Sequence, residues 1–102
     1  MKKSSAAEPK SKGFVFRLFV AGAELHSMKA KDNLEKLCAS HIREPFEIEI
    51  VDVLESYKVA LENKIFLTPA LIMVSPAPAV TIFGNLNETE KVIQALRLGG
   101  ND

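Results

Sequence analysis

A nearly unbroken apolar run over residues 14–20 most constrains how this chain can fold. Its sequence, Phe-Val-Phe-Arg-Leu-Phe-Val, is rich in side chains that favour β structure. A strand with so few polar positions has both faces covered, so we expect it at the centre of a sheet, ending at Gly22. From Ser27 to His41 the apolar positions follow helical spacing instead, and Ser27 is the expected cap of this one-sided helix.

The rest of the sequence alternates short predicted strands and helices. Residues 46–51 alternate at period two, which predicts a strand with Phe46, Ile48 and Ile50 facing inward. Two more strands, joined as an antiparallel hairpin, are expected over 70–74 and 79–83. The two further predicted helices are a short one over 55–63 capped by Ser56, and one that begins at a capping box of Asn87 and Glu90 and stops at Gly99 and Gly100.

This order of elements predicts the fold class. A helix between the first two strands makes them parallel, with a right-handed connection. The later hairpin is antiparallel, so the sheet is mixed and four-stranded. The order strand, helix, strand, helix, strand, strand, helix is that of the thioredoxin-like α/β fold, which we predict for residues 14–98.

Length and charge narrow the class of protein further. A chain of 102 residues holds one domain. Residues 1–13, with four lysines against one glutamate, are predicted to be a flexible basic leader, and residues 99–102 a C-terminal end. Thirteen basic residues balance 13 acidic ones, which argues against nucleic-acid binding. We expect a cytoplasmic protein without a membrane partner, since no signal peptide or spanning run is present.

The sequence offers little that could carry out catalysis. A single cysteine, Cys38, excludes a Cys-x-x-Cys pair, and its place among helical leucines favours a small buried apolar role. Cys38 and His41, with His26 distant, are too few for a zinc site, and no phosphate-binding glycine loop is present. Glu47 and Glu49 fall on the outward face of a strand. We therefore expect a binding protein without a cofactor.

Two polar or proline positions stand at strand ends. Asp52 follows the alternating strand, where it could cap or orient a loop. Thr68-Pro69 precedes an apolar strand, which is where thioredoxin-like proteins typically carry a cis proline that shapes a partner-binding surface. An X-Pro bond adopts the cis form at a cost of only about 0.5–1 kcal/mol, and the sequence leaves cis and trans open.

Four blocks together resemble the KaiB family, small bacterial proteins that include a circadian clock component. They are FRLFVAG at 16–22, IVDVL at 50–54, KIFLTPAL at 64–71 and FGNLNETEKV at 83–92. The resemblance implies a non-catalytic protein that binds KaiC, a hexameric RecA-like ATPase and autokinase, and favours its dephosphorylation. It implies Lys29 and Lys64 as partner-binding residues. The family motifs also include Asp52, Thr68, Pro69 and Gly84, which we expect to serve the fold.

The family is also known for two folds, a thioredoxin-like monomer and a tetramer in which the second half is rebuilt. Where the clock proteins have a glycine and an acid in the last helix, this chain has Ala95 and Arg97. Alanine for glycine within a helix is worth about 1 kcal/mol, and a cation in the last turn about 0.3–1 kcal/mol. We therefore expect a thioredoxin-like monomer or weak dimer, with the tetrameric fold as the alternative.

Two other departures concern the biological role. Val80-Thr81 replaces a basic pair, and residues 99–102 do not continue into the usual acidic tail. These changes favour stress adaptation over a true clock. The competing interpretation is a thioredoxin-fold stress protein that acts through Cys38 or as an adaptor, and native thiol titration separates the two.

Overall fold

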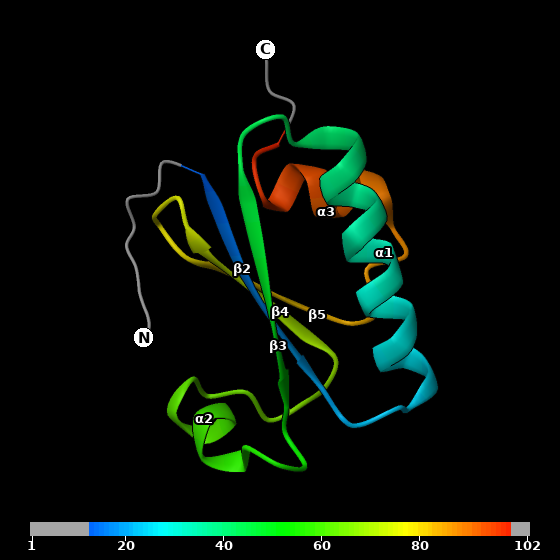
Figure 1. The fold of residues 1–102 in the computed structure, drawn as a ribbon, viewed down its shortest axis with the longest axis vertical. Helices are drawn as coiled ribbons and strands as arrows, with labels where there is room; N and C mark the ends of the chain where they lie inside the picture. The colour runs from blue at the N-terminus through cyan, green and yellow to red at the C-terminus, as the bar shows by residue number, and fades with distance from the viewer. Residues whose placement is uncertain (1–12, 99–102) are drawn as a thin grey trace.

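The computed structural model describes residues 13–98, which form four strands and three helices (Figure 1). The predicted order of elements is confirmed. In chain order they are β2 (Phe14–Val20), α1 (Leu25–His41), β3 (Phe46–Asp52), α2 (Tyr57–Glu62), β4 (Ala70–Ser75), β5 (Val80–Phe83) and α3 (Thr89–Ala95).

The four strands form one mixed sheet in the order β3-β2-β4-β5. β2 is central, as its apolar sequence predicts, and pairs in parallel with β3 and antiparallel with β4. β4 and β5 form the expected antiparallel hairpin. Phe19 lies beside Val51 on one side and Ala70 on the other, so the last residues of β2 and β3 meet the first of β4. The thioredoxin-like topology is therefore confirmed.

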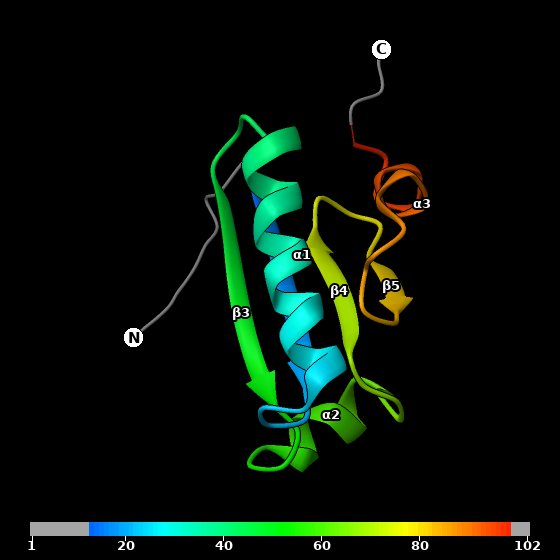
Figure 2. The ribbon, with the colours of Figure 1, turned by 90° about the vertical axis from the view of Figure 1, so that its right-hand side faces the viewer.

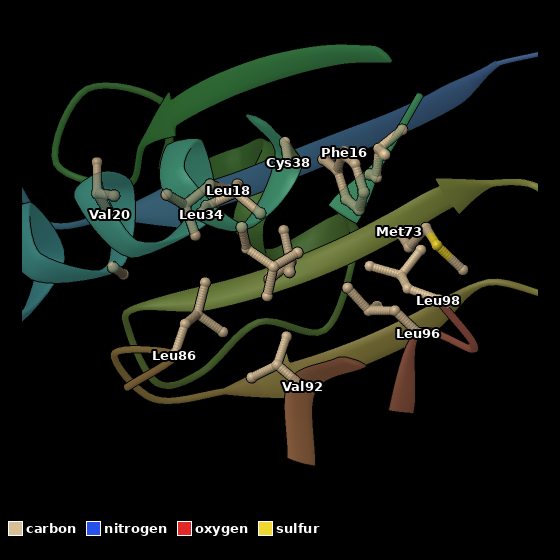
Figure 3. Close-up of a cluster of buried hydrophobic side chains, with 14 residues drawn as sticks. Phe16, Leu18, Val20, Leu34, Cys38, Met73, Leu86, Val92, Leu96 and Leu98 are labelled. Atoms are coloured by element: carbon tan, nitrogen blue, oxygen red, sulfur yellow. The ribbon is translucent and has the colours of Figure 1, made fainter. Parts of the chain in front are cut away.

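Helices α1 and α3 cover one face of the sheet (Figures 1 and 2). The larger hydrophobic core lies beneath them and takes side chains from β2 and β4 as well as from both helices (Figure 3). Its buried members are Phe16, Leu18, Val20, Ala30, Leu34, Leu37, Cys38, Ile42, Leu71, Met73, Leu86, Val92, Leu96 and Leu98.

The opposite face of the sheet carries a smaller core under α2. Its buried members are Phe19, Val51, Ala60, Ile65, Ala70 and Ile72. Because α2 has only six residues, it covers one end of this face, and Val74 in β4 remains 43% exposed. The sheet is thus packed on both sides at one end and on one side at the other.

The inward face predicted for β3 is correct in direction but only partly buried. Ile48 packs against the larger core, whereas Phe46 and Ile50 are 42% and 40% exposed. The reason is that β3 is an edge strand, and no element among residues 13–98 pairs with its outer side.

The predicted caps of the three helices agree with the structure only at α2, and there only in position. Glu24, not Ser27, caps α1, and its carboxylate accepts hydrogen bonds from the amides of His26 and Ser27. Ser56 stands at the start of α2 without a side-chain capping bond. The N-cap of α3 is Glu88 rather than Asn87, and its side chain makes no capping bond; the backbone amide of Asn87 donates to the Asn85 side chain.

The ends of α2 and α3 share one geometry that the sequence does not predict. Each helix is followed by a residue in the left-handed region, Lys64 at φ 60° and Arg97 at φ 59°. The next amide then bonds back to the helix: Ile65 donates to the Ala60 carbonyl and Leu98 to that of Ile93. This pattern is a Schellman motif, normally completed by glycine.

The end of α3 therefore corrects two expectations. The helix stops at Ala95, before Gly99 and Gly100, which lie outside the described residues. Ala95 is the last helical residue rather than an interior one, and Arg97 lies just beyond the last turn. Its positive charge still stands near the negative end of the helix dipole.

Candidate functional site

Four loops converge at one end of the sheet, which we call the loop end. They follow β2 (21–24), β3 (53–56) and β5 (84–88) and precede β4 (63–69). The parallel and antiparallel pairings bring these ends together, and α2 and the first turn of α1 lie there too (Figures 1 and 2).

Asp52 ties two of these loops together. One carboxylate oxygen, Oδ1, accepts hydrogen bonds from the amides of Gly22 and Leu54, each 3.0 Å long. Gly22 has φ 57°, which suits glycine, and a Cβ there would lie 3.2 Å from a Leu54 methyl group. Asp52 thus orients loops, in the role its place at a strand end indicates.

The start of α1 is where thioredoxin-like redox proteins carry their cysteines. Here the buried Ser27 hydroxyl accepts a hydrogen bond from the Ala21 amide (3.0 Å) and donates one to the Glu24 carboxylate (3.2 Å). The hydrogen bond from the His26 amide is the largest cause of a lowered pKa at Glu24; desolvation opposes it, and the amide and hydroxyl of Ser27 lower the pKa further. This network fixes the loop and leaves no nucleophile free.

Cys38 lies within the larger core, as predicted. Its side chain is fully buried, and desolvation raises its pKa to about 11. A thiol with so high a pKa is a poor nucleophile at neutral pH. Within residues 13–98, no three side chains of the His, Cys, Asp and Glu types gather as metal ligands.

Pro69 and Gly84 meet at the loop end. The Thr68-Pro69 peptide is cis, which answers the question that the sequence leaves open. The Pro69 carbonyl accepts a hydrogen bond of 2.9 Å from the Gly84 amide and so joins the start of β4 to the end of β5. Gly84 has φ 112°, and this backbone angle, rather than crowding, requires glycine there.

The loop end also carries most of the exposed large apolar side chains. Eight of the 11 such side chains among residues 13–98 belong to its loops or to the adjoining helices and strand end. Phe66 and Leu67 are 72% and 69% exposed. The other six are Leu25, Met28, Leu54, Tyr57, Leu61 and Phe83. Apolar side chains concentrated in this way are typical of a surface that binds another protein.

The two lysines singled out from the sequence flank this apolar surface. Lys64 lies in the loop that follows α2, directly before Ile65 and the exposed Phe66, and Lys29 lies in an early turn of α1. Helices α1 and α2 cover opposite faces of the sheet, and α2 and the first turn of α1 both lie at the loop end (Figures 1 and 2). Arg97 lies toward the other end of the sheet, where its guanidinium donates to the Pro78 carbonyl at 3.4 Å. Ala95 instead lines a pocket together with Phe83 and Gly84.

A groove of about 430 Å³ runs beside the loop end, between α1 and β3. Its lining combines the apolar Met28 and Ile50 with Lys31 and Glu35 at its side. No helix among residues 13–98 is both long and apolar enough to cross a membrane.

Comparison with known proteins now identifies the family. A family model described as the KaiB domain matches residues 17–98. The chain belongs to the KaiB family. It is 38% identical over 82 residues to the circadian clock protein KaiB3 of Synechocystis, covering 80% of each chain. It is 36% identical to the circadian clock oscillator protein KaiB of Prochlorococcus marinus, over 85% of this chain and 81% of that one.

Solved structures confirm the thioredoxin-like fold. The N-terminal domain of Synechococcus elongatus SasA aligns with a TM-score of 0.72 at 17% identity, over 99% of this chain and 100% of that one. Mitochondrial thioredoxin 3 of Saccharomyces cerevisiae aligns with a TM-score of 0.67 at 19% identity, over 86% and 81%. At these identities the likeness shows a shared fold.

Proposed function

We propose that this KaiB-family protein is a non-catalytic regulator that binds a hexameric KaiC-like ATPase and modulates its phosphorylation state. The observation that carries the proposal is the apolar loop end, flanked by Lys29 and Lys64. Family membership supplies the partner class, and the relatives themselves are described as clock proteins. The start of α1 holds Glu24 and Ser27 where a redox enzyme would hold cysteines, which supports a regulator over an oxidoreductase.

The proposed contact combines apolar burial with charge. Phe66 and Leu67 would bury large apolar areas on binding, and Lys64 would face an acidic group of the ATPase. Aromatic side chains at the centre of an interface commonly carry a large part of the binding free energy. Because both are exposed, they can be replaced without disturbing either core.

Substitutions at the loop end test this proposal. We expect Phe66→Ala to weaken binding to the KaiC-like ATPase of the same organism by over about tenfold, as for an interface hot spot. Lys64→Glu should also weaken it, with a stronger effect at low salt. The matched controls are Val74→Ala, an exposed apolar position on the sheet away from the loop end, and Lys36→Glu on α1. Unchanged affinity in Phe66→Ala and Lys64→Glu would contradict the proposed surface.

We further propose that the regulated output is stress adaptation rather than a true rhythm. The support is Val80-Thr81, where the clock pattern has a basic pair. Deleting the gene should lower survival under stress and leave any daily rhythm of gene expression intact. Loss of a rhythm with unaltered survival would contradict this part of the proposal.

A further inference from the structure

Leu54 is among the most exposed apolar residues in the described part of the chain. It is 71% exposed, close to the 72% of Phe66. The residue before it, Val53, packs against the smaller core, whereas Leu54 contributes to neither hydrophobic cluster. Packing within the domain therefore does not explain why this position carries a leucine.

The backbone around Leu54 is held by closely spaced hydrogen bonds. The Val53 amide donates to the Val20 carbonyl at 2.8 Å, which extends the pairing of β2 with β3 by one residue. The amides of residues 55 and 56 donate to the backbone carbonyl of Asp52 at 3.0 and 2.8 Å. The Leu54 amide donates to Asp52 Oδ1 at 3.0 Å, in the manner of an Asx turn. Every amide of this turn thus has a partner, and the turn has one defined conformation.

Asp52 also joins this turn to Gly22, on which the Leu54 side chain rests. The same Oδ1 atom accepts a hydrogen bond from the Gly22 amide at 3.0 Å. A Leu54 methyl group lies so close to Gly22 that a Cβ there would approach it to 3.2 Å. Asp52 therefore fixes both the backbone that carries Leu54 and the backbone beneath it. An apolar side chain that is ordered in advance loses less conformational entropy when a partner buries it.

We infer that Leu54 is a preformed contact for the KaiC-like ATPase, and that Asp52 is the positioning residue that presents it. This role rests on the proposed function, because the turn at 53–56 belongs to the loop end together with Phe66, beside α2 (Figure 1). The hydrogen bonds of the turn use only backbone atoms and the Asp52 carboxylate, so the leucine side chain serves the partner rather than the turn. Asp52 acts through Leu54 and does not itself touch the ATPase.

Methyl NMR on the free protein tests the preformed geometry without any partner. We expect a nuclear Overhauser effect between a Leu54 methyl group and the Gly22 α protons. The Leu54 methyl groups should also move less on the ps–ns timescale than those of Leu61, an exposed leucine of α2. Asp52→Ala should abolish the Overhauser effect, whereas Asp52→Asn, whose amide oxygen still accepts both bonds, should retain it. Leu54 methyl groups as mobile as those of Leu61 would overturn the preformed contact.

A double-mutant cycle with the ATPase tests the positioning role. Leu54→Ala should weaken binding about tenfold, as expected for losing a leucine side chain that the partner buries. Asp52→Ala should weaken binding about fivefold alone but less than about twofold when combined with Leu54→Ala, because Asp52 acts through that side chain. Leu61→Ala gives the matched control cycle, in which the two effects should multiply. Asp52→Asn should restore normal affinity, whereas a merely structural role would change only the free energy of unfolding.

The outcomes distinguish this role of Leu54 from the proposed function as a whole. If Phe66→Ala weakens binding and Leu54→Ala does not, the loop end remains the interface and Leu54 is not a contact. If Asp52→Ala weakens binding equally with and without Leu54→Ala, Asp52 is not its positioning residue. If neither Phe66→Ala nor Leu54→Ala weakens binding, the proposed surface is wrong and the role of Leu54 falls with it.

Discussion

Two basic residues hold a backbone conformation that normally requires glycine. Lys64 and Arg97 both adopt φ near 60° and end a helix. They are held there because the next residues, Ile65 and Leu98, are buried in the two cores. A left-handed residue other than glycine costs about 1–3 kcal/mol. Lys64 therefore combines a strained structural position with the partner contact proposed for its side chain.

Glycine at these two positions separates folding from binding. Glycine relieves the backbone strain but also gives the unfolded chain more conformational freedom, which offsets part of the gain. We expect Lys64→Gly and Arg97→Gly each to raise the free energy of unfolding in urea by about 1 kcal/mol. Lys64→Gly should at the same time weaken binding to the ATPase, whereas Arg97→Gly, at the other end of the sheet, should leave it unchanged. Lys64→Ala is the control, since it removes the side chain but keeps the strain. A stabilised Lys64→Gly that binds normally would assign Lys64 to the fold alone.

The burial of Cys38 makes a prediction about reactivity. A pKa raised from 9.0 to about 11 lowers the thiolate fraction at neutral pH about a hundredfold. We expect the native protein to react with a thiol reagent only as fast as it unfolds, and the denatured protein to react at once. Rapid reaction of Cys38 in the folded protein would support the alternative, a stress protein that acts through this thiol.

The same shift gives a pH dependence of stability with a definite sign. Since the pKa of Cys38 is higher in the folded state, the unfolded chain loses its proton first as pH rises. The contribution of the neutral thiol is therefore fully present below about pH 9 and is lost between about pH 9 and 11. The difference in unfolding free energy between the protein and Cys38→Ala should shrink over that window. A difference that stays constant would contradict the raised pKa.

At the scale of the elements, the start of α1 holds a hydrogen-bond network that joins the helix to the loop after β2. Ser27 is fully buried at this point, and its hydroxyl satisfies the Ala21 amide. Ser27→Ala leaves that amide without its partner and should destabilise the fold by about 1–3 kcal/mol in urea unfolding. Ser40→Ala, an exposed position near the end of the same helix, should change stability by less than about 0.5 kcal/mol. If Ser27→Ala and Ser40→Ala changed the unfolding free energy equally, the hydrogen bond of Ser27 would not stabilise the fold.

The existence and order of the elements could be predicted from sequence, whereas their termini could not. The apolar run at 14–20 and the helical spacing before His41 are patterns that local chemistry alone produces. The cap depends on where the helix begins, and α1 begins at Leu25, two residues before Ser27. Glu24 therefore accepts from the first amides of the helix, while the Ser27 hydroxyl accepts from the Ala21 amide of the preceding loop.

At the scale of the whole molecule, the candidate surface is formed by segments far apart in sequence. The sequence indicated Lys29 and Lys64 through a family resemblance, and Asp52, Pro69 and Gly84 as motif residues. It gave no sign that Phe66 and Leu67 are exposed, because an apolar residue next to a strand usually packs in the core. In the loop before β4, Ile65 packs in the smaller core, whereas the next two residues, Phe66 and Leu67, lie outside both cores.

The central claim is that a thioredoxin-like monomer binds the ATPase through its loop end. Size-exclusion chromatography with light scattering measures the mass of the free protein and its co-elution with the KaiC-like ATPase and ATP in one experiment. We predict a free monomer near 11.2 kDa that moves into the hexamer peak. A free tetramer would contradict the monomeric fold. A monomer that never enters the hexamer peak, so that the unaltered protein and Phe66→Ala elute alike, would contradict binding through the loop end.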